Sequence, residues 1–134
     1  MVQMQVKLGP ATLRNPVVLA AGTSGVMGEI EDALNLSTIG AITTKSITKE
    51  PRIGNEPVRM VTLQSGMMNA IGLANEGIDS FIENHAQRVP SLDTVVIGSV
   101  AGDTIEAYVA VASAMDSIVG IDLVEINVSC PNTQ

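Results

Sequence analysis

Four continuous apolar runs divide this chain, and the segments between them have helical character. Runs of this kind are typical of strands that are buried on both faces of a parallel sheet. Because parallel neighbours need a crossover connection, strands that alternate with helices predict βαβ units and an α/β fold. The runs cover Val17–Ala20, Gly40–Thr44, Thr94–Val100 and Ile121–Val128.

Small and polar residues lie where each of these runs ends. They are Ala20–Gly22, Lys45 with Ser46, Ser99, and Asn127–Asn132. The carboxyl ends of the strands form the catalytic face of a TIM (β/α)8 barrel. We therefore expect residues 1–134 to supply a hairpin and about the first four strands, roughly half of a single barrel domain of about 250 residues or more. A doubly wound sheet is the alternative, although no Gly-x-Gly-x-x-Gly fingerprint follows the first run.

The segments between the runs predict the remaining elements. Gln3–Leu8 alternates polar and apolar residues, and Gly9-Pro10 marks a turn before Ala11–Arg14. This hairpin would either plug the N-terminal mouth of the barrel or lie on the surface. Helices are expected at 29–36 and at 80–89, the second with Asp79 as its cap. A third helix is expected after Gly102, with Asp103 as its cap. Its core stripe would be Ile105, Tyr108, Val109, Ala112 and Met115.

The connection after the second run is unusually long. Ile47–Ser65 exceeds the common length of such loops, and long loops on the active-site side of a barrel usually cover a ligand. Met60–Leu63 predicts a small strand within it. In the segment Gly66–Leu73, Asn69 is either a turn-former or an amide for a substrate. Lys45, directly before the connection, is either a fixed cation for an anionic ligand or an ordinary surface lysine.

The last run ends in a group of small polar residues around the only cysteine. Asn127 offers an amide that both donates and accepts, and Pro131 ends the strand. Cys130 offers a thiol that can serve as a base or nucleophile once it is deprotonated. The alternative for a lone cysteine is an inert, small apolar side chain. His85, the only histidine, falls on a helix flank and is expected to be structural or exposed.

Composition excludes several classes of partner. The formal net charge is −7 and no cluster of Lys or Arg occurs, which argues against nucleic acid and anionic membrane surfaces. No apolar run reaches the roughly 18 residues of a membrane span. A single cysteine excludes an intrachain disulfide framework and suits a reducing cytoplasm. We expect no metal site.

Four motifs together resemble a known family. Asn-Val-Ser-Cys-Pro-Asn at 127–132 is similar to the signature of class 1 dihydroorotate dehydrogenases, and Gly66–Gly77 resembles the substrate loop of their NAD-linked class 1B. The segment 44–55, with Thr-Lys-Ser-Ile-Thr and then Glu-Pro-Arg and Gly-Asn, resembles their flavin-contacting strand end and following loop. The resemblance extends from about Leu8 to Asn132. The dihydroorotate-dehydrogenase-like domain of dihydropyrimidine dehydrogenases is the related alternative.

The resemblance implies oxidation of L-dihydroorotate to orotate, a step of pyrimidine biosynthesis, with FMN in the barrel mouth. Cys130 would be the catalytic base. The family usually has Ser at position 21 and frequently Asn at position 99, so the contact at Ala21 would come from the backbone and that at Ser99 from a shorter side chain. The implied FMN contacts are Ala21, Lys45, Ser46, Ser99 and Asn127, and the implied substrate contacts are Lys45, Asn69, Ala70, Ile71, Gly72, Leu73, Asn127 and Asn132.

The class 1B resemblance also implies partners. A second subunit would carry FAD and a [2Fe–2S] cluster and pass electrons to NAD⁺, in a heterotetramer built on a homodimer of catalytic subunits. The single cysteine of this chain cannot itself hold a four-cysteine cluster. The family's second lysine, a later Asn-Ser/Thr pair and a Gly-rich phosphate site all fall beyond residue 134. We therefore expect these 134 residues alone to bind FMN weakly or not at all and to be inactive. A flavin-binding barrel with another reaction is the remaining alternative.

Overall fold

The computed structural model describes residues 2–27 and 29–133, and its centre is a parallel four-stranded sheet. The strand order follows the sequence without a reversal, β3-β4-β7-β8. All three neighbouring pairs are parallel, and a register shift between Val96 and Ile97 interrupts the last pair. The strands are β3 (Val18–Leu19), β4 (Ala41–Thr43), β7 (Val95–Val100) and β8 (Ile121–Ile126).

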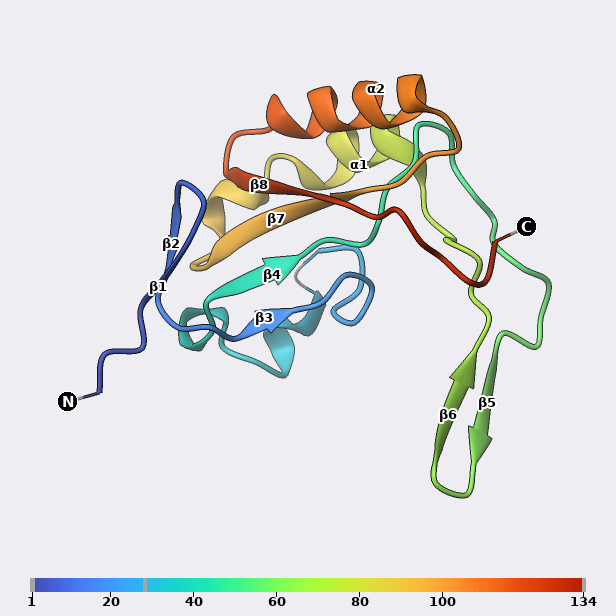
Figure 1. Ribbon diagram of the computed structural model, residues 1–134, viewed down its shortest axis with the longest axis horizontal. Helices are drawn as coiled ribbons and strands as arrows, with labels where there is room; N and C mark the ends of the chain where they lie inside the picture. Colours follow the sequence, from blue (N-terminus) through green and yellow to red (C-terminus); the bar gives the residue numbers. More distant parts are fainter. Residues whose placement is uncertain (1, 28, 134) are drawn as a thin grey trace.

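The connections between these strands contribute to one common core. Helices α1 (Gly77–His85) and α2 (Ile105–Asp116) cover the same face of the sheet (Figure 1). Met27 and Leu36, from the β3–β4 connection, belong to the same buried cluster as Phe81 of α1 and Met115 of α2. A doubly wound sheet would divide its helices between two faces. The one-sided arrangement and the unreversed strand order therefore favour the barrel alternative, with the sheet still open in this chain.

The opposite face of the sheet carries a smaller core, which the N-terminal hairpin covers. The hairpin pairs β1 (Val6–Leu8) with β2 (Ala11–Leu13). Leu13 is buried against Ala41 and Ile97, in the first half of their strands. The Arg14 guanidinium then donates to the carbonyl oxygens of Ser37 (2.6 Å) and Asp93 (2.8 Å). The predicted hairpin is thus confirmed, and it packs where the strands begin.

A second hairpin projects from the other end of the sheet. It joins β5 (Met60–Leu63) to β6 (Gly66–Asn69) and lies near the carboxyl ends of the parallel strands (Figure 1). Its base is closed by an antiparallel bridge in which Arg52 and Asn75 exchange backbone hydrogen bonds of 2.8 and 2.9 Å. The strand predicted at Met60–Leu63 is confirmed.

The first two predicted helices differ from the structure. In place of a helix at 29–36 there are two short 3-10 turns, η1 (Glu29–Asp32) and η2 (Leu36–Thr38). Asn35 ends any continuous helix because its side chain accepts the N–H of Ser37 and starts the second turn. Helix α1 begins at Gly77, three residues earlier than expected, and Asp79 is not its cap. A third 3-10 turn, η3 (Val89–Ser91), follows it.

Helix α2 also corrects two expectations. Its N-cap is Thr104, whose hydroxyl accepts the N–H of Ala107 (3.1 Å), whereas the Asp103 carboxylate pairs with Arg52. Ile105 and Val109 of the predicted core stripe are 77% and 59% exposed. The buried stripe is instead Val111 and Met115, with Tyr108 and Ala112 partly buried.

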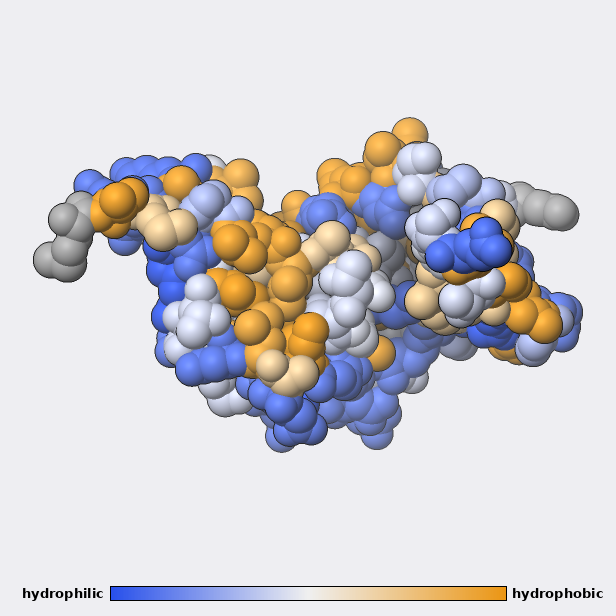
Figure 2. Space-filling model, turned by 90° about the horizontal axis from the view of Figure 1, so that it is seen from below, coloured by the Kyte–Doolittle hydropathy of each residue, from blue (hydrophilic) through white to orange (hydrophobic). Residues whose placement is uncertain are grey.

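The face turned away from α1 and α2 shows hydrophobic surface gathered over the sheet, and a hollow separates this body from the β5–β6 hairpin (Figure 2). Of the helices in the described residues, none has the length and apolar character to cross a membrane.

Candidate functional site

A cleft of about 550 Å³ lies between the carboxyl ends of the parallel strands and the β5–β6 hairpin. Four separate stretches of chain build it: the segment after β3, the segment after β4, the hairpin with the loop that follows it, and the loop after β8. Its lining residues are Ala21, Gly22, Thr23, Lys45, Ser46, Met60, Met67, Asn69, Ile71, Gly72, Leu73, Asn127, Cys130 and Asn132.

The cleft brings together most of the residues that the sequence predicted for a site. Only Ala70 and Ser99 of that set do not line it. Ala70 is held beside it by backbone bonds, and Ser99 is fully buried behind Ser46. Thr23, Met60 and Met67 line the cleft without having been predicted. The two methionines come from the hairpin strands, so only the folded hairpin shows that they face the site.

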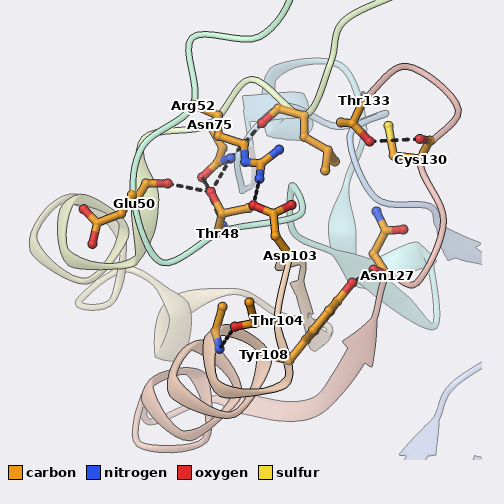
Figure 3. Close-up of polar contacts among 12 residues, drawn as sticks. Thr48, Glu50, Arg52, Asn75, Asp103, Thr104, Tyr108, Asn127, Cys130 and Thr133 are labelled. Carbon is orange, nitrogen blue, oxygen red and sulfur yellow. Dashed lines mark hydrogen bonds and ion pairs between the residues drawn. The ribbon is translucent and has the colours of Figure 1, made fainter.

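Asn127 is fixed from several directions at the end of β8. Its side-chain oxygen accepts the N–H of Ser129 (3.2 Å), and its backbone N–H donates to the carbonyl of Val100 (2.9 Å). The Tyr108 hydroxyl of α2 donates to the Asn127 carbonyl at 2.5 Å (Figure 3). With its oxygen engaged, the side-chain amide presents its NH₂ group toward Ser46 and the cleft.

A directed chain of hydrogen bonds continues behind Asn127. The Ser99 hydroxyl donates to the Glu125 carboxylate (2.8 Å), so it accepts from Ser46 at 2.9 Å. Since the Ser46 proton is then used, the Ser46 oxygen accepts from the Asn127 amide at 3.0 Å. Ser46 and Ser99 therefore orient the Asn127 amide. Both hydrogen bonds of the Ser99 hydroxyl, to Ser46 and to Glu125, are made within the protein.

Lys45 is the only charged residue among those that line the cleft in the described structure. No carboxylate of the described residues lies within ion-pair distance of its amine. The amine lies over Gly22, where a Cβ would be 3.7 Å from Nζ, and the φ of +75° at Gly22 favours glycine as well. The backbone N–H of Lys45 donates to Val26 (2.9 Å), which fixes where the side chain starts. This arrangement offers one positive charge to an anionic ligand.

The loop after β6 approaches the cleft with an unusual backbone. Gly72 and Leu73 both adopt left-handed conformations, with φ of +73° and +54°. A Cβ at Gly72 would lie 2.8 Å from the Asn55 side chain, so only glycine allows this packing. Asn55 donates to the carbonyl oxygens of Ala70 (3.0 Å) and Asn132 (2.9 Å). The sequence motif contained Asn55, but no role for it followed from the sequence.

Cys130 is half-buried and begins a turn that hydrogen bonds from Thr133 close. The backbone N–H and the hydroxyl of Thr133 donate to the Cys130 carbonyl at 3.4 and 3.1 Å (Figure 3). The Asn132 amide reaches toward Asn69 of β6 at 3.4 Å. The cysteine thus lies in a cleft with three amide side chains and one lysine, the groups needed to hold a polar anion beside a thiol.

A polar network anchors the excursion between β4 and α1. The Asn75 side-chain oxygen accepts the N–H groups of Thr48 (3.1 Å) and Gly77 (2.9 Å), and the Thr48 hydroxyl donates to the Glu50 carbonyl (2.6 Å). Arg52 and Asp103 form an ion pair beside it (Figure 3). These contacts tie the base of the excursion to the start of α1 and to the loop before α2.

His85 lies outside the cleft, as predicted. Its ring pairs with Glu76 (2.7 Å) and packs against Phe81 with a centroid distance of 5.4 Å. Among the described residues no group of three or more His, Cys, Asp and Glu side chains is placed to hold a metal ion.

The cleft suits a flat, partly anionic ligand. Ala21 and Gly22 leave their side of it without bulky side chains, Met60 and Met67 give an apolar wall opposite, and Lys45 supplies a charge. A flavin ring needs apolar contact on its faces and polar contacts at its edge, and this donor set fits one. The fold and the cleft define a parallel α/β protein whose candidate ligand site lies at the carboxyl ends of its strands.

Comparison with known proteins then gives the family. The model of the dihydroorotate dehydrogenase family matches residues 3–134, and the chain belongs to this family. It is 42% identical over 131 residues to the dihydroorotate dehydrogenase B (NAD(+)) catalytic subunit of Thermoanaerobacter sp. (strain X514), and 43% identical over 131 residues to that of Geobacter sulfurreducens. In both cases the alignment covers 98% of this chain and 43% of the relative.

A solved structure supports the fold. The crystal structure of a dihydroorotate dehydrogenase from Eimeria tenella, in complex with ferulenol, superposes with a TM-score of 0.77 at 21% identity. The match covers 98% of this chain and 38% of that one.

Proposed function

We propose that the full-length protein containing this chain is an FMN-dependent dihydroorotate dehydrogenase of pyrimidine biosynthesis, which oxidises L-dihydroorotate to orotate. The observation that carries the proposal is the convergence of Lys45, Asn69, Asn127, Cys130 and Asn132 on one cleft. These residues come from separate motifs of the sequence, and family membership supplies the reaction. The chain spans about 43% of the length of the curated relatives it matches.

In this proposal residues 1–134 form the N-terminal half of a single FMN-binding TIM-barrel domain. The one-sided connections and the unreversed strand order support it, as does the superposition on a dihydroorotate dehydrogenase structure. Since β3 and β8 have free edges within the described sheet, further strands can add there. By themselves, these 134 residues are expected to be inactive.

The reaction removes a proton from C5 and a hydride from C6 of dihydroorotate. Bound FMN would supply the hydride acceptor. Cys130 would take the C5 proton onto Sγ, as the general base of the reaction. Lys45 would offset the negative charge of the substrate carboxylate and of the flavin edge.

The remaining residues of the cleft would bind and orient the two ligands. The amides of Asn69, Asn127 and Asn132 would hold the carboxylate and the ring amides of the substrate, and the backbone of 70–73 would complete its contacts. Ser46 and the backbone at Ala21 would contact FMN, together with Lys45 and Asn127. A direct contact of Ser99 with FMN stays a prediction, and its observed bonds support an indirect role through Ser46.

The names of the relatives support a proposal for the electron acceptor and the partners. Their names specify NAD(+) and a catalytic subunit. We infer an NAD-linked enzyme in which a homodimer of this subunit joins a second subunit that carries FAD and a [2Fe–2S] cluster, giving a cytoplasmic heterotetramer.

The visible spectrum of the full-length protein tests the proposal, recorded before and after anaerobic addition of L-dihydroorotate. A flavin band that bleaches is the expected result. A flavin band that persists would reject the substrate and leave a flavin-binding barrel with another reaction. A folded protein without flavin would reject the cofactor.

A further inference from the structure

Asn55 is the residue through which two walls of the cleft meet. One wall is the loop after β6, residues 70–73, and the other is the loop after β8, residues 127–133. The Asn55 NH₂ group has two protons, and it donates at 3.0 Å to Ala70 in the first loop and at 2.9 Å to Asn132 in the second.

Further contacts fix Asn55 to the first loop. Its backbone N–H donates to the carbonyl of Ile71 (3.1 Å), and its side chain fills the space over Gly72 that a Cβ would occupy. The bond to Asn132 is therefore made from a rigid base. In the described residues one other hydrogen bond joins the loop after β8 to this side of the cleft, the longer contact of 3.4 Å between Asn132 and Asn69, the last residue of β6.

Asn55 does not line the cleft. It lies on a neighbouring surface depression with Arg52, Ile53 and Gly54, and Gly72 and Asn132 face both spaces. Asn55 therefore cannot be counted among the residues that touch a ligand in the cleft. Its amide nevertheless holds the Asn132 carbonyl, and the turn from Cys130 to Thr133 is closed by its own bonds, so a displacement of Asn132 would also displace Cys130.

We propose that Asn55 is a positioning residue for the turn that carries Cys130 and Asn132, which it fixes to the substrate-contacting loop. The proposal rests on the proposed function for the roles of Cys130 and Asn132. The positioning itself rests only on the contacts above. An aspartate at 55 keeps the shape but turns both donors into acceptors that face two carbonyl oxygens, so the two walls would separate.

The test measures the alkylation rate of Cys130 by iodoacetamide in the full-length protein, followed by mass spectrometry of the peptide that contains Cys130. One hydrogen bond corresponds to roughly a three- to tenfold change in an opening equilibrium, so Asn55→Asp is expected to speed alkylation by roughly that factor. Orotate affinity is expected to weaken, with the Michaelis constant for dihydroorotate rising more than kcat falls.

Asn15→Asp is the matched control. Asn15 also donates from its NH₂ group to a loop carbonyl, that of Thr38 at 2.9 Å, but it does so where β3 and β4 begin, away from the cleft. Its variant is expected to leave the alkylation rate of Cys130 unchanged.

Unchanged alkylation and unchanged orotate affinity in a folded Asn55→Asp protein would overturn the proposal. If that variant does not fold, Asn55→Ala replaces it, and loss of the fold in both would make Asn55 a general folding residue and overturn the proposal too. Faster alkylation in Asn55→Asp, together with an unmutated full-length protein that fails to oxidise dihydroorotate, would support the positioning role and reject the proposed function, because alkylation needs neither substrate nor flavin.

Discussion

Single residues in this cleft derive their orientation from neighbouring side chains, and some of these neighbours lie behind the cleft lining. A series of hydrogen bonds orients the Asn127 amide. The amide donates to Ser46, Ser46 donates to Ser99, and Ser99 donates to the Glu125 carboxylate. Each hydroxyl in that series has one proton, so the direction follows once the carboxylate accepts. Loss of a middle member would leave a buried polar atom without a partner, which costs roughly 1–3 kcal/mol.

Cys130→Ala gives the first prediction at this scale. Without the thiol the C5 proton has no acceptor in the cleft, so kcat of the full-length enzyme is expected to fall by roughly 10²–10⁴-fold. Flavin content and the Michaelis constant should change little, because the alanine removes only the sulfur. Steady-state turnover with dihydroorotate measures this. Val128→Ala, an 81% exposed neighbour in the same loop, is the control, and equal activity of the two variants would refute the assignment.

At the scale of elements, the loop before η1 depends on a carboxylate. The Glu29 side chain accepts the N–H groups of Val26 (2.9 Å) and Met27 (2.8 Å). Burial by itself raises the pKa of Glu29, but the backbone hydrogen bonds, with a contribution from His85, outweigh it and hold the pKa below its ordinary value of 4.5. The loop at the end of β3, beside Gly22, is thus held in place by an ionised group.

The pH dependence of stability follows from this direction. The pKa of Glu29 is lower in the folded state than in the unfolded state. Its contribution to the free energy of unfolding is therefore fully present at a pH above the unfolded-state pKa, and it is lost as the pH falls through the folded-state pKa. Glu29→Gln is therefore expected to lower the free energy of unfolding at about pH 6.5 and to lose that difference in more acid solution. Urea unfolding at several pH values measures it. Glu83→Gln, on the exposed side of α1, should show no such trend, and a pH-independent effect at Glu29 would contradict the argument.

Helix α2 offers a second prediction for an element. Thr104→Ala removes the side-chain acceptor at its N-terminus and is expected to lower the free energy of unfolding by about 1 kcal/mol. Asp103→Ala, one residue earlier, removes only an exposed ion pair with Arg52 and should cost less than about 1 kcal/mol. Denaturant unfolding of the two variants compares them. If Asp103→Ala lowered the free energy of unfolding more than Thr104→Ala does, the N-cap of α2 would be Asp103 and not Thr104.

For the whole molecule, the sequence predicted the four parallel strands and the residues of the cleft better than it predicted where helices begin and which residues cap them. The four strands were recognisable because burial on both faces leaves uninterrupted apolar runs, and the motif residues met in one cleft because parallel strands end at one edge. The choice between Asp103 and Thr104 depended on Arg52, which is 51 residues away. Asn55 could not be assigned because its function lies in bonds to two distant carbonyls. Such contacts exist only after folding.

The solitary charge of the cleft has a kinetic consequence. Lys45 attracts an anion only at close range, whereas the chain as a whole has a formal net charge of −7. Dissolved salt shortens the Debye length from about 10 Å at 0.1 M to about 3 Å at 1 M, so it weakens the distant repulsion before it weakens the contact with Lys45. In a full-length protein whose net charge is also negative, stopped-flow binding of orotate should therefore show an association rate that rises with ionic strength, and a falling rate would mean that attraction already acts outside the cleft. Concentrated salt would thus speed the entry of an anion into the cleft, because it screens the repulsion that slows entry in dilute buffer.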